Sequence, residues 1–269
     1  MAQIEVTRDG AVAVCTITPP DIYMNIDTVA ELDRVSADLA DDAGVRAVIF
    51  TGGHAGVFIQ HYDVAELAQM AGGLREKGFS FSPDRPVKPR QLDAVFERFA
   101  TMDKPVIAAL NGNAMGGGFE LALASDIRVT QPGDWSFGLP EINLGILPGA
   151  GGTQRLARLV GQARALEMVL RGRTVSPDEA LKLGMVHEVC VDGALIGARR
   201  IAAEIASKTP LAVRHIKHLI RNVASGPLDD GLGLERTLFL DLLVQDEAVE
   251  RMTAFDAGGR DIRRVSRDT

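Results

Sequence analysis

One short segment, in which a buried strand runs directly into a glycine-rich turn, constrains the fold of this chain more than any other. Residues 105–110 (PVIAAL) form an apolar run typical of a buried strand, and residues 111–120 read NGNAMGGGFE. Glycine permits positive φ angles and a close approach of the backbone, and the amides that open a helix point outward as donors. The segment therefore predicts a strand, a tight turn and a helix that begins at an anion or oxyanion site. A turn that serves packing alone is the alternative, and the glycine spacing fits neither a P-loop nor a dinucleotide fingerprint.

A second glycine-rich segment follows about one element later and carries a second glutamate. Residues 139–155 read LPEINLGILPGAGGTQR, so Glu141 lies between Pro140 and apolar residues. Apolar surroundings raise the pKa of a carboxyl group, which suits the group to proton transfer near neutral pH. Glu120, at the start of the predicted helix, is the other candidate acid. The alternatives are a capping or ion-paired Glu141 and a Glu120 that only complements the helix dipole.

Composition and charge exclude several classes of protein. The chain has 269 residues, of which 46% are hydrophobic, and its formal net charge is −7. It is too apolar for a disordered chain, no apolar run approaches the ~18 residues of a membrane span, and the first residues lack a signal-peptide pattern. An acidic balance without a basic stripe argues against nucleic acid as the main partner. We therefore expect a globular, cytoplasmic protein with no membrane segment.

Few residues outside the two motifs predict a ligand site. Cys15 and Cys190 stand far apart and belong to no CxxC pair, so they predict neither a disulfide framework nor a metal site. A local basic cluster, Arg85, Lys88 and Arg90, is spaced by prolines and is a candidate for binding a small anion. A solvated loop is the alternative interpretation of that cluster.

The order of apolar patterns predicts an α/β protein. Strand-like runs alternate with amphipathic helical patterns in the first half, and an irregular stretch at 72–90 predicts an exposed loop or lid. Residues 176–179 (SPDE) predict a helix start, with serine as the cap, proline in the first position and glutamate completing a capping box. The expected strands lie at 11–17, 44–51, 105–110 and 126–130, and the expected helices at 27–39, 91–100 and 119–124.

The last third of the chain has a different pattern from the rest. From residue 192 onward the apolar residues follow an almost wholly helical period, with breaks at residues 209–210 (TP) and 225–227 (SGP). We therefore predict a boundary near residue 195. It divides an α/β core, residues 1–195, from a C-terminal helical region, residues 196–269.

Together the two glycine-rich motifs resemble those of the crotonase superfamily, the enoyl-CoA hydratase/isomerase family. The chain matches the family patterns NGxAxGGGxE and PExxLGxxPGxGGTQRL in the same order, with both glutamates present. The surrounding segments 44–53 (GVRAVIFTGG), 58–64 (FIQHYDV) and 104–109 (KPVIAA) are also similar, and weaker resemblance extends from about residue 4 to 255. The resemblance implies a spiral of ββα turns with a C-terminal helical trimerisation region. It further implies a homotrimer or a dimer of trimers.

The resemblance also implies a substrate and an oxyanion hole. In such enzymes an acyl thioester of coenzyme A lies with its carbonyl oxygen between two backbone amides, and the matching positions are Tyr62 and Gly117. Fixed donors at these positions would stabilise the negative charge that builds on that oxygen. Other expected substrate contacts are Asp63, Val64, Ala65 and Gly149.

Glu120 and Glu141 match the two acids that handle water in this family. We assign Glu120 to deprotonate the water for attack at Cβ and Glu141 to deliver a proton to Cα, with the Gly149 amide helping to hold the water. Two coupled carboxyls titrate as a pair, one of them raised, so that one donates while the other accepts. The reaction implies no metal and no cofactor, since coenzyme A is part of the substrate.

Three departures from the family pattern stand near the expected site. The family usually has Gly-Ala before the aspartate, whereas this chain has His61 and Tyr62, whose rings either shape the pocket or take part in chemistry. A basic residue often found after the aspartate is Ala65 here, and the usual Glu-Lys-Arg near the C-terminus is replaced by residues 257–259 (AGG). Candidates to hold the coenzyme A phosphates instead are Arg260, Arg263 and Arg264.

These features predict a hydro-lyase that adds water across the 2,3 double bond of a 2-enoyl-CoA thioester. A Δ3,Δ2-enoyl-CoA isomerase, or another crotonase reaction, is the alternative within enzymes, because one glutamate and an oxyanion hole suffice to move a proton. Retention of both acids favours hydration. A non-catalytic acyl-CoA-binding protein is the alternative from another class, and the change at His61 and Tyr62 is its support.

Overall fold

The fold is built on a six-stranded sheet that is parallel except at one edge. The computed structural model describes residues 2–223, 225–258 and 262. The first two strands pair antiparallel and the later strands join them in parallel. In spatial order the strands are β1 (Ile4–Asp9), β2 (Val12–Ile17), β3 (Ala47–Gly52), β5 (Val106–Leu110), β7 (Ile127–Thr130) and β10 (Glu188–Val189).

The chain also forms a second, smaller sheet of four strands. Its strands in spatial order are β4 (Gly56–Ile59), β6 (Gly112–Met115), β8 (Phe137–Gly138) and β9 (Thr174–Val175). The chain therefore passes repeatedly from a strand of the first sheet to one of the second and then to a helix: β3, β4 and α2 (Val64–Glu76), then β5, β6 and α4 (Gly117–Ala124). This repeat is the spiral of ββα turns that the family resemblance implies.

The pairing of β6 with β4 requires a glycine at residue 112. A Cβ atom built on Gly112 would lie 1.9 Å from the carbonyl carbon of Gly56, which is far inside van der Waals contact. Only a residue without a side chain allows β6 to pair with β4 at this distance. The first glycine of the NGNAMGGGFE segment thus serves the sheet, and the later three serve the turn into α4.

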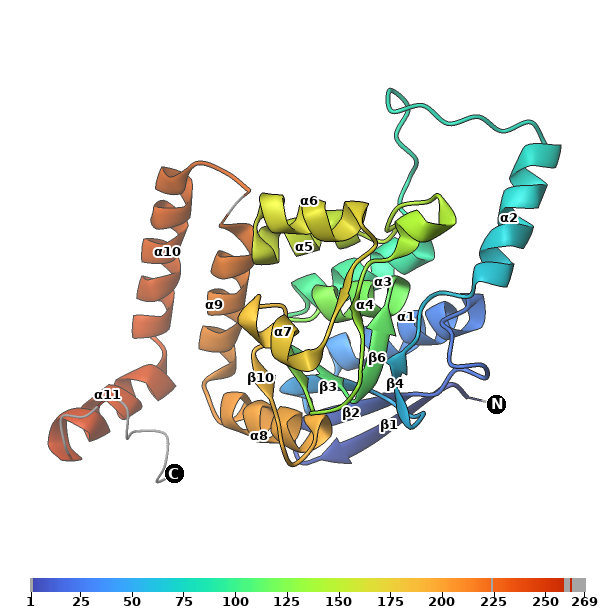
Figure 1. The fold of residues 1–269 in the computed structure, drawn as a ribbon. Helices are drawn as coiled ribbons and strands as arrows, with labels where there is room; N and C mark the ends of the chain where they lie inside the picture. Colours follow the sequence, from blue (N-terminus) through green and yellow to red (C-terminus); the bar gives the residue numbers. More distant parts are fainter. Residues whose placement is uncertain (1, 224, 259–261, 263–269) are drawn as a thin grey trace.

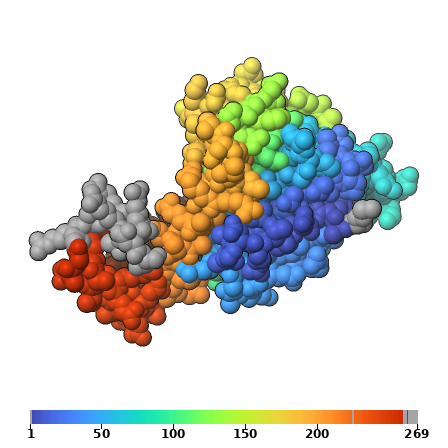
Figure 2. All heavy atoms as spheres, turned by 90° about the horizontal axis from the view of Figure 1, so that it is seen from below, coloured from blue at the N-terminus to red at the C-terminus, as the bar shows by residue number. Residues whose placement is uncertain are grey.

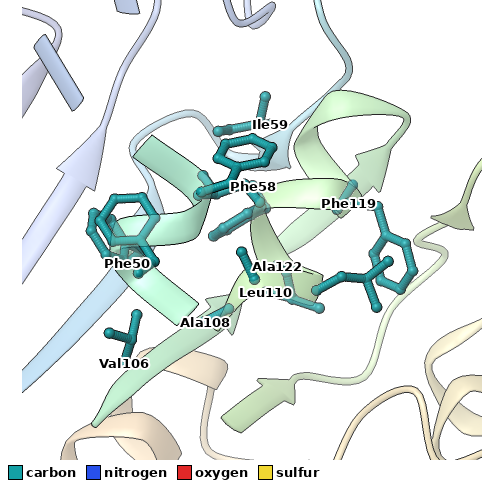
Figure 3. Close-up of a cluster of buried hydrophobic side chains, with 14 of the residues drawn as sticks. Phe50, Phe58, Ile59, Val106, Ala108, Leu110, Phe119 and Ala122 are labelled. Atoms are coloured by element: carbon teal, nitrogen blue, oxygen red, sulfur yellow. The ribbon is translucent and has the colours of Figure 1, made fainter. Parts of the chain in front are cut away.

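Helices cover the sheet on both faces, and α4 lies at the centre of the core. All eight residues of α4 are buried. The core on this side also takes residues from α1 (Ile26–Asp41) and α3 (Gln91–Thr101). Figure 3 shows part of it, with Phe50, Val106, Ala108 and Leu110 of the first sheet near Phe119 and Ala122 of α4, and Phe58 and Ile59 of β4.

Helix α8 (Ala194–Ala206) begins at the boundary that the sequence pattern predicts near residue 195. Its buried residues Ala194, Ala198 and Ala202 pack on the opposite face of the large sheet, against side chains of β2, β3, β5 and β7. By packing, α8 therefore belongs to the α/β body, because a division at residue 195 separates it from the sheet that it covers. Independent folding of residues 1–195 and 196–269 stays a prediction.

A helical arm follows α8 and extends away from the body (Figures 1 and 2). It consists of α9 (Pro210–Asn222), α10 (Leu228–Leu243) and α11 (Asp246–Gly258). Helix α9 is tied to the body by Lys217, whose Nζ lies 2.8 Å from Asp126 Oδ2. The helices α10 and α11 contain no buried residue.

The exposed loop predicted to begin at residue 72 begins at residue 77 in the structure. Residues 72–76, which include two glycines, are the last turn of α2, and the exposed connection is 77–90. Glycine disfavours a helix by about 1 kcal/mol relative to alanine, so the sequence pattern indicated a loop there. In the structure α2 starts at the Asp63 cap and continues through both glycines. Figure 1 shows the following connection standing clear of the body.

The remaining elements complete the second sheet and its cover. They are the 3-10 helix η1 (Glu141–Leu144), α5 (Gly152–Val160), α6 (Gln162–Leu170) and α7 (Pro177–Lys182). Helix α7 begins with the predicted cap, because the Ser176 hydroxyl accepts the Glu179 N–H and Pro177 takes the first position. The predicted capping box does not form, since the Glu179 carboxylate pairs with Arg173 instead. None of the described helices combines the length and apolar character needed to cross a membrane.

Candidate active site

A cavity of about 930 Å³ opens beside the start of α4. Its walls come from the ends of β4 and β6, the start of α4, η1, the connection after η1, and helices α1 and α2. Most of the residues predicted for the site line this one cavity, although they come from distant parts of the chain. They are Tyr62, Val64, Gly117, Glu120, Glu141 and Gly149.

Two residues predicted as substrate contacts, Asp63 and Ala65, are not among those that line the cavity. The Asp63 carboxylate instead accepts the N–H of Ala65 at 2.7 Å and of Glu66 at 3.4 Å, which caps α2. An N-cap aspartate satisfies donors that no helix carbonyl can reach. The structure therefore gives the Asp-Val-Ala sequence a local role in starting the helix behind Tyr62.

The backbones of Tyr62 and Gly117 lie against each other at the cavity. A Cβ atom built on Gly117 would stand 3.5 Å from the Tyr62 nitrogen and 3.3 Å from the Tyr62 Cβ. Gly117 is the first residue of α4, where amides have no carbonyl of their own helix to reach. Neither of these two N–H groups donates to an acceptor within the described part of the chain. Two free amides therefore stand side by side at the cavity.

Backbone and side-chain bonds hold Tyr62 from both sides. Met24 N–H donates to the His61 carbonyl at 2.9 Å, and Asp63 N–H donates to the Met24 carbonyl at 2.8 Å. The Tyr62 hydroxyl donates to Glu66 Oε2 at 2.9 Å, and that oxygen also accepts the Ile26 N–H at 3.0 Å. Burial, together with the Glu66 carboxylate, raises the pKa of Tyr62 to about 12. The phenol therefore stays protonated and is engaged with α2.

His61 is held by its neighbours at the cavity wall. Its ring stacks on Tyr23 with centroids 4.5 Å apart, and its Nδ1 lies 2.7 Å from the Tyr62 carbonyl oxygen. A carbonyl oxygen only accepts, so Nδ1 is the donor in this contact. His61 Cβ and Glu141 Oε1 both lie within 4 Å of the position that a Cβ on Gly116 would take. Gly116 has a φ of +47°, and its missing side chain leaves room for both residues.

Glu120 projects from the first turn of α4 and is 3% exposed. Its Oε1 accepts two backbone amides, Ala150 N–H at 2.8 Å and Gly152 N–H at 2.7 Å. Burial raises the pKa of Glu120, and the two amides, Arg155 and Arg90 oppose that rise. Bonds to the charged form favour ionisation, so this carboxyl has donors ready for its anion.

Glu141 has the opposite surroundings. It begins η1, and its Oε2 is buried with no hydrogen-bond partner among the described residues. Burial and, to a smaller extent, the charge of Glu120 together raise the pKa of Glu141 to about 7. Both carboxyls therefore have a raised pKa, but Glu120 has two amides to bind its anion, whereas the buried Glu141 oxygen has no such donor among the described residues. Two carboxyls in different surroundings can divide the roles of proton acceptor and proton donor.

The raised pKa of Glu141 predicts how stability depends on pH. The folded state binds a proton that an unfolded glutamate has already lost, so stability falls as pH rises from about 4.5 towards 7. We expect the midpoint of thermal unfolding to fall more between pH 5 and pH 8 in the native protein than in Glu141→Gln. Differential scanning calorimetry measures this difference, and Glu120 titrates in both proteins. Parallel pH profiles would show that Glu141 is not the group responsible.

The basic cluster predicted as an anion site separates in the structure. Arg85 and Lys88 are exposed on the 77–90 connection, whereas Arg90 lines the cavity. The Arg90 guanidinium pairs with Asp93 at 2.8 Å and donates to the carbonyl of Gly149. The other three arginines considered for the coenzyme A phosphates, Arg260, Arg263 and Arg264, lie outside the described residues.

Sequence reasoning missed part of the site. It did not identify the amides of Ala150 and Gly152 as partners of Glu120, or Glu66 as the partner of the Tyr62 hydroxyl. The glycines at 149–152 were a signal that backbone amides are accessible there. Within the described residues, no three His, Cys, Asp or Glu side chains gather in a way that would hold a metal ion.

Comparison with known proteins adds independent support to these features. The model of the enoyl-CoA hydratase/isomerase family matches residues 7–259. A short-chain-enoyl-CoA hydratase of Clostridium acetobutylicum is 36% identical over 251 residues, which cover 92% of each chain. A carnitinyl-CoA dehydratase of Citrobacter koseri is 34% identical over 255 residues, which cover 93% of each chain. Both names agree with the predicted enzyme class, a hydro-lyase.

The solved structures agree with the sequence matches. The crystal structure of an enoyl-CoA hydratase subunit from Geobacillus kaustophilus superposes with a TM-score of 0.83 at 34% identity, covering 95% of both chains. The predicted fold class, an α/β protein with the spiral that the family resemblance implies, is therefore confirmed.

Proposed function

The chain belongs to the enoyl-CoA hydratase/isomerase family, and from that premise we propose that it adds water across the 2,3 double bond of a 2-enoyl-CoA thioester. The observation that carries the proposal is the pair of glutamates at one cavity. Glu120 accepts two amides on one oxygen, while Glu141 has a buried oxygen without a partner in the described part of the chain. An isomerase needs only one such acid, so two differently placed acids favour hydration.

The first proposed step is polarisation of the thioester. The thioester carbonyl oxygen lies between the amides of Tyr62 and Gly117, whose N–H groups have no acceptor among the described residues. Attack by water at Cβ moves electron density onto this oxygen as an enolate. A fixed donor at such an oxygen is typically worth ~2.7–4 kcal/mol in the transition state.

The glutamates then divide the proton transfers. Glu120 uses the oxygen that is not bound to Ala150 and Gly152 to take a proton from water, and the hydroxyl adds to Cβ. Glu141, protonated near neutral pH, gives its proton to Cα as the enolate collapses. The Gly149 amide, on an exposed part of the cavity wall, helps to hold the water. A proton then returns from Glu120 to Glu141 through solvent, which restores both acids, so the cycle balances with water as the only co-reactant and needs no metal or redox cofactor.

Absorbance tests this proposal directly. Hydration removes the conjugation between the double bond and the thioester, so absorbance of that chromophore falls when the purified protein meets a 2-enoyl-CoA. We expect this loss with at least one member of a panel of acyl chain lengths, with 3-hydroxyacyl-CoA as the product. Binding without loss of absorbance would indicate an acyl-CoA-binding protein. A gain of absorbance from 3-enoyl-CoA, with no loss from 2-enoyl-CoA, would indicate an isomerase.

We also propose that the protein assembles as a homotrimer or a dimer of trimers through its helical arm. Helix α10 has no buried residue, and its apolar side chains include Leu232 and Leu234, each 39% exposed, and Phe239, 58% exposed. Apolar side chains gathered on an unburied helix mark an interaction surface. Light scattering should therefore give the mass of three or six chains. A stable, active monomer at low micromolar concentration would contradict the assembly.

A further inference from the structure

The loop that holds Glu120 is itself held from outside by two arginines. The amides of Ala150 and Gly152 donate to Glu120, while the carbonyls of the same loop accept guanidinium groups. Arg155 Nη1 donates to the Ala150 carbonyl at 2.7 Å, and Arg90 Nη2 donates to the Gly149 carbonyl at 2.5 Å. The loop is therefore bonded on two sides, to Glu120 through two amides and to the arginines through two carbonyls.

Arg155 is close in sequence to the loop carbonyl that it binds, whereas Arg90 is distant in sequence from its own. Arg155 lies five residues after Ala150, at the start of α5, whereas Arg90 lies 59 residues before Gly149. Arg90 is the N-cap residue of α3 and lines the cavity. Its bond to Gly149 therefore ties the catalytic loop to a different helix across the cavity.

Asp93 fixes the direction of the Arg90 guanidinium. Arg90 Nε donates to Asp93 Oδ2 at 2.9 Å, and Nη2 donates to Oδ1 at 2.8 Å. The Arg90 backbone N–H also donates to Oδ2 at 2.8 Å. A two-point pair of this kind fixes the plane of the guanidinium, and Nη2 still has a second hydrogen for the Gly149 carbonyl. Lysine has no such fork, so it could not reproduce this geometry.

We propose that Arg90 is a positioning residue for Glu120, and that it acts by holding the Gly149 carbonyl so that the next amides stay aimed at the carboxylate. This inference rests on the proposed function, in which Glu120 accepts the proton of water. The loop contains three glycines between residues 149 and 152, and glycine loses more conformational freedom on ordering than any other residue. Such a loop needs external bonds to keep two amides on one oxygen.

The charged groups near Glu120 also support a role for Arg90. The charged groups that act on Glu120 are Arg155 from α5 and Arg90 from the start of α3, and Glu120 in turn acts on Glu141. Asp93 and Glu97 of α3 pair in turn with the two arginines. Arg90 and Arg155 both lower the pKa of Glu120 against the effect of burial. Loss of Arg90 therefore removes a positive charge and loosens the amides, and both effects raise the pKa of Glu120.

The test compares Arg90→Met with a matched control, Arg34→Met. Arg34 is a surface arginine on α1 that also pairs with a carboxylate, Asp38, but does not line the cavity. We expect Arg90→Met to lower kcat by ~10²-fold, the cost typical of a catalytic group misplaced by about 1 Å, with a smaller change in KM. The acid limb of the kcat profile should move to higher pH. Arg34→Met should leave all three quantities unchanged.

A second readout does not depend on turnover. The carboxyl carbon of Glu120, labelled with carbon-13 and assigned by its absence in Glu120→Gln, reports the pKa of this group by NMR. We expect a higher pKa in Arg90→Met than in the native protein and in Arg34→Met. If the native protein does not hydrate enoyl-CoA but this shift appears, the proposed function fails and the positioning role of Arg90 stands.

Two outcomes would overturn the role of Arg90. One is a native protein that hydrates its substrate while Arg90→Met keeps both its kcat and the pKa of Glu120. The other is a rise in KM alone, which would make Arg90 a substrate contact. If circular dichroism shows that Arg90→Met does not fold, Arg90→Lys replaces it. That variant keeps the charge and loses the fork, so kcat should fall while the pKa of Glu120 stays nearer its native value, and an unchanged kcat would overturn the proposal.

Discussion

Replacing Glu120 or Glu141 by glutamine should each abolish measurable hydration of a 2-enoyl-CoA while leaving binding of the thioester largely intact. Both changes preserve the size of the side chain and remove its proton chemistry. Loss of a positioned general acid or base usually costs ~10²–10⁴-fold. Steady-state absorbance assays measure the rate, and equilibrium titration with a saturated acyl-CoA measures binding. Near-native turnover in either variant would show that its assigned role is wrong.

The effects of the two glutamine substitutions on the rate should not be additive. In the proposed reaction Glu120 and Glu141 act in sequence, so the double variant should be little slower than the slower single variant. The environment of each residue predicts a difference in folding. Glutamine at 120 places an amide where one oxygen accepts two N–H groups. Glutamine at 141 removes a buried carboxyl, one oxygen of which has no partner among the residues that the structure describes. Thermal unfolding of both variants is therefore the necessary control.

Tyr62→Pro should lose hydration severely, whereas Tyr62→Phe should retain most of it. Proline has no N–H, so the first variant removes one of the two proposed oxyanion donors. Loss of one such donor typically costs ~10²–10³-fold in kcat. Tyr62→Phe keeps the amide and removes only the hydroxyl that donates to Glu66, and Glu66 keeps its bond from Ile26. The ratio of the two kcat values measures the contribution of the backbone against that of the side chain.

The control for this pair is the fold of the proline variant, because proline also restricts φ. Circular dichroism and thermal unfolding of Tyr62→Pro should show a folded protein before its rate is interpreted. A fall of ~10²-fold or more in Tyr62→Phe would mean that the phenol takes part in chemistry, and the assignment of Tyr62 as a backbone donor would then be wrong.

Most of the α/β body could be predicted from local patterns. The strands β2, β3, β5 and β7 are apolar runs bounded by turn residues, and the core-facing helices α1 and α3 show a clear helical period. The spiral itself could not be predicted from periodicity. It depends on strands such as β6, only four residues long, that pair with segments more than 50 residues away. The family resemblance supplied that long-range information.

The position of α8 was predicted less well, for a physical reason. Its core-facing residues are alanines and a glycine, which allow close packing on the sheet but give a weak hydrophobic signal. Its period therefore resembled that of the arm that follows it. The distinction lies in what each face contacts, and α8 contacts four strands of the sheet.

The sequence identified the two acids of the candidate site, but it did not reveal the hydrogen bonds that support them. Glu120 and Glu141 were identified because each stands in a glycine-rich motif, and both line the same cavity. The bonds that distinguish them come from residues 30 positions or more away, such as the Ala150 amide on Glu120. Arg90 appeared as one cation of an exposed loop, because nothing local indicates its bond to Gly149.

The central claim, that water adds to the substrate double bond at this cavity, is tested most directly by isotope incorporation. The purified protein would convert a 2-enoyl-CoA in water enriched in oxygen-18, and mass spectrometry would locate the label in the product. We predict one labelled oxygen at Cβ of a 3-hydroxyacyl-CoA, and no labelled product with Glu120→Gln. Product without labelled oxygen, or label incorporated at the native rate by Glu120→Gln, would contradict the account.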